Sequence, residues 1–295
     1  MDVEGELSMG SDVFSGKALG SASSSEPWVA PVIDTSVAHP ARMYDYYLGG
    51  KDNFPADREA AERILAVGPQ TRVFAQANRA FLGRAVRFLA EQGVDQFLDI
   101  GTGIPAAGNT HEVAQAVNPA ARVAYVDNDP IVLAHARALM AGHGLGATTV
   151  VQADLRDPAA ILADPAVRAA IDLGRPVALM LVAVLHFVTE AEDPDAITKL
   201  LRDALPSGSY LVISHATGDF VPQEQTAEVH AITRVYEQRA TSALTLRTGD
   251  RIREFFGEFA LLEPGLVQVP FWRPDGEIPA GMEQVVFYGG VARKA

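Results

Sequence analysis

The stretch Val94-Asp-Gln-Phe-Leu-Asp-Ile-Gly-Thr-Gly-Ile-Pro105 carries the pattern from which the fold is predicted. Its apolar residues end at Gly101, which is typical of a buried parallel strand leading into a tight loop. Gly101 and Gly103 lack a Cβ atom, so a ligand can lie close to the backbone of this loop. Asp99 comes just before the glycines, where its carboxylate can orient the loop or meet a cationic ligand group. A strand followed by Gly-x-Gly is common, so its meaning depends on the residues that follow.

The composition of the 295 residues limits the classes of function. Apolar residues make up 48%, which is enough for one large α/β domain or for a core with extensions. The formal net charge of −13 disfavours a nucleic-acid partner and suits neutral or cationic ligands. Because cysteine is absent, disulfides, zinc–thiolate sites and cysteine nucleophiles are excluded. No apolar run reaches ~20 residues and no secretory signal is present, so we expect no membrane span and a cytoplasmic location.

The composition changes along the chain and predicts three regions. Residues 1–26 are of low complexity and rich in serine, which indicates a disordered tail. Residues 27–93 form an N-terminal extension and helical cap, with helices expected at 55–67 and 70–91 from apolar spacing and from their Pro and Gly boundaries. Residues 94–295 form the main domain.

Residues 41–54 of the extension hold three tyrosines, Tyr44, Tyr46 and Tyr47, ahead of a Gly-Gly pair and Lys51. One interpretation is a short helix that docks its aromatic face and ends at glycine. The other is a flap that covers a ligand, because tyrosine offers both an apolar body and a hydroxyl. The sequence alone favours the first interpretation.

Strands and helices alternate after the glycine loop, which predicts a mostly parallel sheet with helices on both faces. Strands are expected at 97–100, 122–126, 148–153, 176–184, 210–214, 261–269 and 284–292, and helices at 110–117, 130–141, 158–170, 193–205, 222–239 and 250–256. Only a loop joins the last two strands, so they are expected to be antiparallel neighbours. The predicted fold class is therefore α/β, with a seven-stranded sheet whose last strand is antiparallel.

Three acidic residues stand at the ends of the first three predicted strands: Asp99, Asp127 and Asp154. In doubly wound sheets, ligands bind beyond these carboxyl ends. Asp127 follows Gly103 by 24 residues, about the offset at which an acid reaches ribose hydroxyls. Asp154 can accept from an adenine amino group, with the Leu155 amide as a donor beside it. Each acid could instead cap a helix, which is the favoured interpretation for Asp129 but not for the other two.

Two cofactors are compatible with this spacing. Gly101-x-Gly103-x-x-Ala106 matches the dinucleotide fingerprint and suggests an NAD-dependent oxidoreductase. However, Pro105 and Gly108 delay the next helix, so no helix end stands over a pyrophosphate. S-adenosylmethionine has no phosphate, and the delayed helix and antiparallel last strand fit it better.

These motifs resemble those of class I S-adenosylmethionine-dependent methyltransferases. Asp99-Ile-Gly-Thr-Gly103 is similar to motif I, Tyr125-Val-Asp-Asn-Asp129 to the second motif and Gln152-Ala-Asp-Leu155 to the third. Val182-Ala-Val-Leu-His-Phe187 resembles the motif of the fourth strand. Motif I departs from Gly-x-Gly-x-Gly, because Pro105 replaces the third glycine.

A narrower resemblance covers about residue 38 to the C-terminus. Tyr44-Asp-Tyr-Tyr-Leu-Gly-Gly-Lys-Asp-Asn53, Gly108-Asn-Thr-His-Glu-Val-Ala-Gln115 and Leu185-His-Phe-Val188 are similar to a bacterial family of S-adenosyl methyltransferases with no settled substrate. This resemblance implies a Rossmann-like class I fold and S-adenosyl-L-methionine as cofactor. The cofactor-binding candidates are Asp99, Gly101, Thr102, Gly103, Asp127, Asn128, Asp154, Leu155, Ala183, Tyr44 and Tyr46.

Two residues are candidates for catalysis, His186 and Tyr47. His186 follows the apolar fourth strand by two residues, at the rim of the expected cleft. Its imidazole can take a proton from an oxygen or nitrogen nucleophile, or it can hydrogen-bond the backbone and only shape the loop. Methyl transfer depends mainly on alignment and on exclusion of water, so no fixed catalytic signature is expected.

Other motifs are weaker. His111-Glu-Val-Ala-Gln115 lacks the second histidine of a zinc site, so no metal is expected. Ser214-His215 lacks the glycines of a nucleophile elbow, and His215 is more simply structural. The acidic charge favours a small-molecule acceptor, and the oligomeric state is not predicted. A regulatory protein that binds the cofactor without transferring its methyl group is the non-enzymatic alternative.

Overall fold

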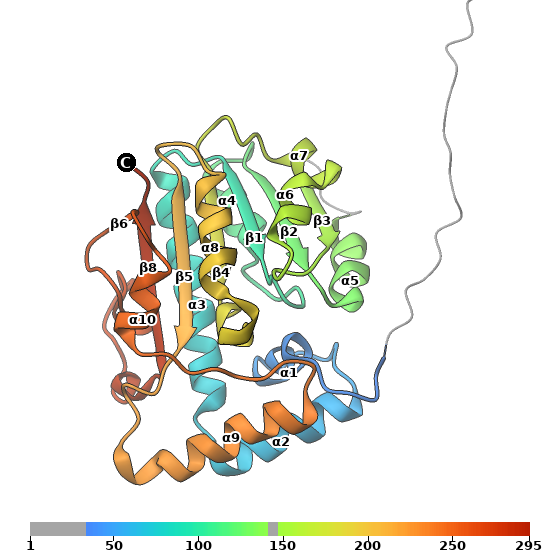
Figure 1. Ribbon diagram of the computed structural model, residues 1–295, viewed down its shortest axis with the longest axis vertical. Coiled ribbons are helices and arrows are strands. Elements are labelled where there is room, and N and C mark those ends of the chain that lie inside the picture. Colours follow the sequence, from blue (N-terminus) through green and yellow to red (C-terminus); the bar gives the residue numbers. More distant parts are fainter. Residues whose placement is uncertain (1–33, 141–146) are drawn as a thin grey trace, which may run out of the picture. The chain divides into compact units, whose positions relative to one another are not determined.

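The computed structural model describes residues 34–140 and 147–295 (Figure 1). The predicted tail, 1–26, lies outside the described residues, as does the start of the extension at 27–33. The domain boundaries expected at residues 26 and 93 stay predictions.

The centre of the fold is a sheet of strand order β3-β2-β1-β4-β5-β8-β6, in which β7 also pairs with β8. The strands are β1 (Gln96–Ile100), β2 (Arg122–Asp127), β3 (Thr148–Gln152), β4 (Ala178–Val182), β5 (Tyr210–Ala216), β6 (Ala260–Leu261), β7 (Val267–Gln268) and β8 (Phe287–Arg293). Strands β1 to β5 are parallel to their neighbours, and β8 runs antiparallel to β5. This confirms the α/β class and the antiparallel last strand.

The strand expected at 261–269 is divided, so the sheet has eight strands rather than seven. Its two ends, β6 and β7, pair with different parts of β8, through Leu261 opposite Ala292 and Val267 opposite Gly289. The chain turns away between them at Pro264 and Gly265. Proline has no amide to donate to a strand, and Gly265 adopts a φ of 89°.

The helix expected at 158–170 is also divided, into α6 (Pro158–Ala163) and α7 (Pro165–Ala170). Asp164 stands between them, because a residue before proline is pushed out of the helical region. Its ψ is 128°, and its carboxylate accepts the amides of Ala166 and Val167 to begin the second helix.

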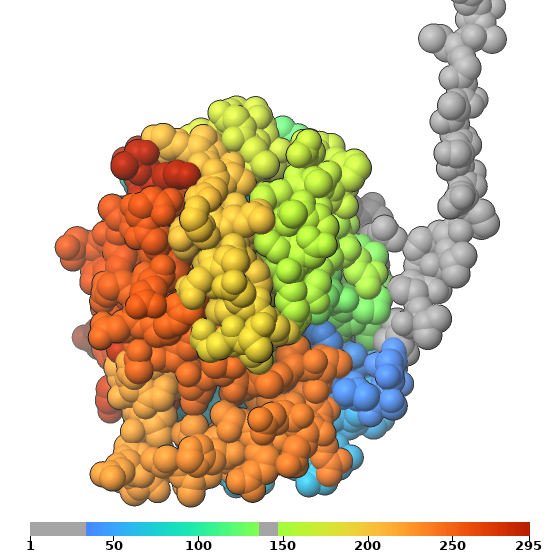
Figure 2. All heavy atoms as spheres, viewed as in Figure 1, coloured from blue at the N-terminus to red at the C-terminus, as the bar shows by residue number. Residues whose placement is uncertain are grey.

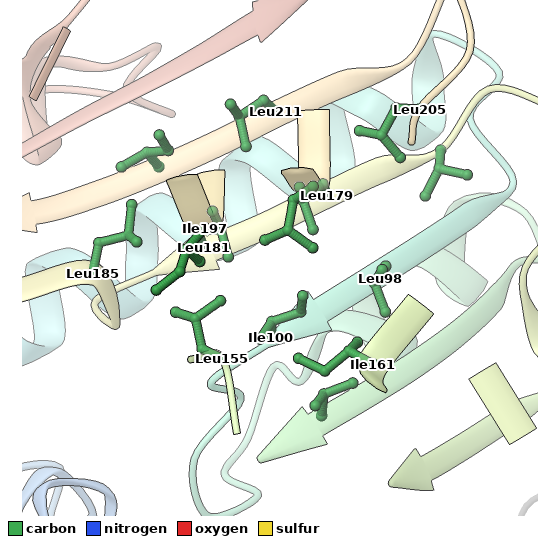
Figure 3. Packing of buried hydrophobic residues seen from close by; sticks show 14 of the residues in the cluster. Leu98, Ile100, Leu155, Ile161, Leu179, Leu181, Leu185, Ile197, Leu205 and Leu211 are labelled. Atoms are coloured by element: carbon green, nitrogen blue, oxygen red, sulfur yellow. The ribbon is translucent and has the colours of Figure 1, made fainter. Parts of the chain in front are cut away.

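Apolar side chains alternate between the two faces of the sheet, as the pleat of a strand requires. On one face Leu98 and Ile100 pack with Leu179 and Leu181 under the helices of that side (Figure 3). Phe97 and its neighbours on the opposite face pack against another set of helices. Burying one such Leu or Ile side chain contributes about 1.5–3 kcal/mol, which explains why both faces are covered.

The first face is covered by α6, α7, α8 (Pro194–Asp203) and α10 (Gly249–Glu254), and the second by α3 (Thr71–Glu91) and α4 (Thr110–Val117). α5 (Pro130–Met140) follows β2. Short 3-10 turns are η1 (Leu185–Phe187), η2 (Glu190–Glu192), η3 (Gln223–Gln225), η4 (Val269–Phe271) and η5 (Met282–Gln284).

A helical cap lies beyond the carboxyl ends of the parallel strands (Figure 1). It consists of α1 (Pro40–Tyr47), α2 (Pro55–Val67) and α9 (Thr226–Arg239), which share one small apolar cluster that includes Ile64. The sequence places the helices expected at 55–67 and 70–91 in the extension and cap, but most of the second, α3, packs on the sheet. In its place α9, which comes from the main domain, packs along α2, so the cap combines the extension with a helix of the main domain.

Two buried ion pairs hold α1, one to the loop after β2 and one to α2 within the cap. Arg42 of α1 contacts Asp129, after β2, at 2.9 Å, and Asp57 of α2 at 3.6 Å. The other oxygen of Asp129 accepts the amide of Ile131 at 3.0 Å, which is the capping role expected for it. The start of α5 and the start of α1 are thus held by one carboxylate.

Candidate active site

A cavity of about 530 Å³ lies between the carboxyl ends of the strands and the cap. This volume falls within the range of small-molecule sites, about 300–1,000 Å³. Its lining comes from the loops after β1 to β5 and from helices α1, α2, α3 and α9. In Figure 2 the orange atoms of α9 and of the segment after it cover this end of the molecule.

The glycine loop after β1 is held on β2 and against Val184. The amide of Gly101 donates to the carbonyl of Val126 at 2.7 Å, and the amide of Gly103 to Asp127 at 2.8 Å. Both glycines have a positive φ, 76° and 69°. A Cβ on Gly101 would lie 2.3 Å from a methyl carbon of Val184, whereas one on Gly103 would meet open space. Thr102 between them lines the cavity, so the loop presents its backbone to a ligand.

Asp127 and Asp99 are both buried at the strand ends. Asp127 accepts the amides of Gly103 and Asp129 at 2.8 and 2.9 Å, while Asp99 accepts the Thr110 hydroxyl at 2.6 Å. Burial raises the pKa of each carboxyl to about 6, and these hydrogen bonds only partly oppose the shift. Both line the cavity, so a ligand that donates to them would favour their ionised form.

Asp154 is already engaged by its neighbours. It accepts the side-chain amide of Asn128 at 3.1 Å and the backbone amide of Arg156 at 2.9 Å. Burial favours its neutral form, but these bonds and the Arg156 charge outweigh burial and lower its pKa. Asn128, which follows β2, and Asp154 and Leu155, which follow β3, all line the cavity.

The three tyrosines of α1 have different surroundings. Tyr44 lines the cavity and donates to the carbonyl of Ala75 at 2.9 Å. Tyr46 points away, with its hydroxyl on Glu62, and neither it nor Lys51 lines the cavity. The helical interpretation of this segment is thus confirmed, and of its three tyrosines Tyr44 and Tyr47 line the cavity.

Tyr47 is buried and lines the cavity. Among the described residues its hydroxyl makes no hydrogen bond of ordinary geometry, but it lies close to the hydroxyl of Tyr236 of α9. Burial raises the pKa of Tyr47 well above its ordinary value and that of Tyr236 to about 12. Both hydroxyls therefore stay neutral and can donate to a ligand.

Ala183 lines the cavity directly after β4 and has a φ of 55°. A non-glycine residue in this region costs about 1–3 kcal/mol and persists only when its surroundings fix it. Here Ser214 does so, because the amide of Ala183 donates to its carbonyl at 3.1 Å and to its hydroxyl at 3.0 Å. Strain of this kind is typical of functional sites.

His186 lies in η1 and is almost completely buried. Its Nδ1 accepts the amide of Ala216 at 3.3 Å, which assigns the proton of the neutral ring to Nε2. Burial lowers its pKa well below the ordinary value, and the charge of Arg247 adds to this. The geometry therefore favours the structural interpretation of His186 over a general base.

His215 is structural, as the sequence favours. Its Nδ1 lies 2.7 Å from the carbonyl of Ala216, and its Nε2 lies 2.9 Å from Arg247. Arg247 also donates to the carbonyls of Leu185 and Val188, at 2.9 and 2.7 Å. One buried arginine thus fixes both ends of the turn that carries His186.

Sequence reasoning missed Arg79, Asn78 and Arg247. Arg79 and Asn78 lie on α3, and both line the cavity. Asn78 links Tyr44 to Ser214 by hydrogen bonds of 3.0 and 2.5 Å. A signal existed for Asn78 alone, because this polar residue falls among the apolar positions of an amphipathic helix.

Within 34–140 and 147–295, no three His, Asp or Glu side chains lie close enough together to hold a metal ion. In the same part of the chain, no helix is long and apolar enough to cross a membrane.

Comparison with known proteins identifies the family. The model of the S-adenosyl methyltransferase family matches residues 26–295. A DUF574 family protein from Streptomyces avermitilis has a similar structure, with 48% identity, a TM-score of 0.84, and 90% of this chain and 100% of that chain covered. A protein from Thermobifida fusca, assigned provisionally as a methyltransferase, shares 42% identity over 91% of this chain and 99% of its own, with a TM-score of 0.82. No curated protein matches the chain in sequence.

The family match decides between the cofactors that the glycine loop left open. It favours S-adenosyl-L-methionine over NAD and an enzyme over a silent binding protein. The chain belongs to the S-adenosyl methyltransferase family and is an S-adenosyl-L-methionine-dependent methyltransferase with a Rossmann-like fold.

Proposed function

We propose that the methyl acceptor is a small, uncharged molecule with an apolar or aromatic body. The single observation that carries this proposal is the division of the cavity lining. The part at the ends of β1 to β3 is polar, while the part under the cap is apolar. Cofactor and acceptor would then occupy one continuous space, as direct transfer between them requires.

The polar part fits S-adenosyl-L-methionine. In this proposal Asp127 accepts from the ribose hydroxyls, while Asn128, Asp154 and Leu155 surround the adenine. The backbone of Thr102 and the strained Ala183 face the remainder of the molecule. The bound cofactor supplies a methyl group on a positively charged sulfur, which the buried acids at the strand ends also favour.

The apolar chamber is the part under the cap. Its lining is Ile64, Phe74, Phe187, Phe220, Val221, Val229, Ile232, Leu244, Leu246, Val286 and Phe287. The acidic residues Glu228 and Glu283 line its rim and are exposed. An anionic acceptor would lose its hydration in the chamber and meet carboxylates at the entrance, both of which are unfavourable. A neutral aromatic ring loses little hydration free energy when it enters the chamber.

Two neutral hydroxyls, of Tyr47 and Tyr236, lie at the cap side of the chamber. They can donate to an oxygen or nitrogen atom of the acceptor and so fix its orientation. His186 can donate from Nε2, but with its Nδ1 engaged it does not take a proton in this tautomer. Transfer therefore rests on alignment and on the exclusion of water rather than on a dedicated base.

We also propose that the enzyme acts on this acceptor in the bacterial cytoplasm. The two similar structures come from bacteria, and S-adenosylmethionine is an intracellular metabolite. The net charge of −13 favours a small acceptor over a nucleic acid.

The test compares a neutral with an anionic acceptor of the same ring size. With 2-naphthol and 6-hydroxy-2-naphthoate as probes, formation of S-adenosylhomocysteine is followed by mass spectrometry. We expect transfer to the neutral phenol at least about tenfold faster, since the carboxylate must lose its hydration. Faster transfer to the carboxylate, or transfer to RNA but to neither phenol, would contradict the proposal.

A further inference from the structure

Arg79 is a cation at the cavity that the proposed function does not yet use. It lies on α3, outside the strand-end motifs, and its side chain lines the cavity. Its Nη2 donates to the carbonyls of Ala106 and Ala107, at 3.0 and 3.3 Å, and to the side chain of Asn109 at 2.9 Å. These three acceptors hold the guanidinium against the segment that follows the glycine loop.

The remaining donors of Arg79 suggest a missing partner. Its Nε is buried and has no hydrogen-bond partner among the described residues. The three groups that its Nη2 contacts are uncharged, so none of them neutralises its positive charge. Asp99 lies within electrostatic reach, and the arginine helps to oppose the burial-driven rise in its pKa, but the two form no ion pair. A fixed cation with an unused buried donor is suited to an anionic ligand group.

The order of the strands indicates which group this is. The acids assigned to adenine and ribose follow β3 and β2, so the cofactor crosses the strand ends in the direction β3, β2, β1. Its methionine end then lies beyond β1, beside Asp99 and within reach of Arg79. The α-carboxylate at that end is the one anionic group of the cofactor. In motif I, Pro105 stands where a third glycine would bring the loop backbone close to this end.

We propose that Arg79 binds the α-carboxylate of the cofactor, so that α3 supplies the contact that the glycine loop lacks. The planar guanidinium edge matches a carboxylate geometrically and can donate two parallel hydrogen bonds to it. The N-terminal extension is then part of the cofactor site and not only a cover for it. This inference rests on the cofactor placement of the proposed function.

The test uses two ligands that differ at this end alone. S-adenosylhomocysteine carries the amino-acid group, and 5′-methylthioadenosine keeps the adenosine and the sulfur without it. Calorimetry on Arg79→Gln should show an affinity about 10- to 100-fold lower for S-adenosylhomocysteine and unchanged for 5′-methylthioadenosine. Arg79→Lys should fall between wild type and Arg79→Gln, because lysine keeps the charge without the planar fork.

Arg87→Gln is the matched control. Arg87 lies two turns further along α3, is partly exposed, and pairs with Asp275 away from the cavity. It should bind both ligands as wild type does. If Arg79→Gln lost affinity equally for both ligands, Arg79 would only hold the loop. If it lost affinity for neither, Arg79 would not contact the cofactor. Either result would overturn the inference. If wild-type protein bound 5′-methylthioadenosine no more weakly than S-adenosylhomocysteine, the cofactor placement itself would be wrong.

Discussion

The polar and apolar parts of the cavity are built in different ways. In the polar part, the proposed cofactor-binding residues lie at the ends of the first three strands, and Asp127 and Asp154 each accept a backbone amide two residues further along the chain, at 2.9 Å. In the apolar chamber, Tyr47, Phe187 and Tyr236 come from distant segments and meet only through packing of the cap. The first part is therefore specified by local motifs, and the second by tertiary contacts.

The largest expected effect is on stability, at the glycine loop, where backbone geometry and the contact with Val184 leave no room for a side chain at Gly101. Gly101→Ala combines a left-handed φ with a Cβ that would lie 2.3 Å from Val184, so we expect a loss of about 2–5 kcal/mol in unfolding free energy. Gly103→Ala meets open space and should lose only about 1–2 kcal/mol. Urea unfolding of both variants measures the difference. Equal losses would mean that the contact with Val184 does not constrain the loop.

The next effect concerns Asp127. Asp127→Ala removes charge-assisted hydrogen bonds of about 1.5–3 kcal/mol to the ribose, so the affinity for S-adenosylhomocysteine should fall roughly ten- to a hundredfold in a folded protein. Unchanged affinity, measured by calorimetry, would leave Asp127 with only its role in holding the loop.

The pKa of Asp127 gives this prediction a pH dependence. Burial raises that pKa to about 6, so the carboxylate takes up a proton as the pH falls through 6. Protonation removes a hydrogen-bond acceptor for the ribose. The affinity for S-adenosylhomocysteine should therefore fall toward pH 5, by at most about tenfold per pH unit, and stay level above pH 7. Asp127→Asn should lose most of this dependence. A wild-type affinity that rises as the pH falls would contradict the sign.

A smaller effect is expected in the apolar chamber, at His186. His186→Asn removes a base, and loss of general-base catalysis would slow transfer about 10²–10⁴-fold. Because Nδ1 is engaged and the ring is neutral, we expect less than about a tenfold loss in kcat with cofactor binding intact. Single-turnover rates with 2-naphthol decide between the structural and the general-base role of His186. A loss of 10² or more would restore the general-base role.

The smallest expected effect is a change in the dynamics of α1. Tyr44 and Tyr47 face the cavity, so hydrogen exchange of residues 40–47 should slow several-fold when S-adenosylhomocysteine binds. The exposed turns of α8, remote from the cavity, serve as the internal reference. Equal exchange of α1 with and without ligand would leave these tyrosines with a packing role alone.

The contrast between the two parts also explains what the sequence could predict. The apolar strand from Phe97 to Ile100 and the glycines after it form a pattern that depends only on neighbouring residues. The fold and the polar part of the cavity could therefore be predicted from the sequence. Tyr46 was expected near the cofactor, but a helix turns successive residues by about 100°, and it faces Glu62 instead. Arg79 and Tyr236 carry no motif, because their roles arise only when α3 and α9 reach the strand ends. Pro264 divided a strand whose apolar pattern looked continuous.

The most direct test of this account is the electron density of crystals grown with S-adenosylhomocysteine. We predict that both ribose hydroxyls lie about 2.5–3.0 Å from the carboxylate of Asp127, with the adenine beside Leu155 and the sulfur facing the apolar chamber. Density with the ribose away from Asp127, or with the sulfur turned away from Phe187 and the chamber, would contradict the division of the cavity into a cofactor part and an acceptor part.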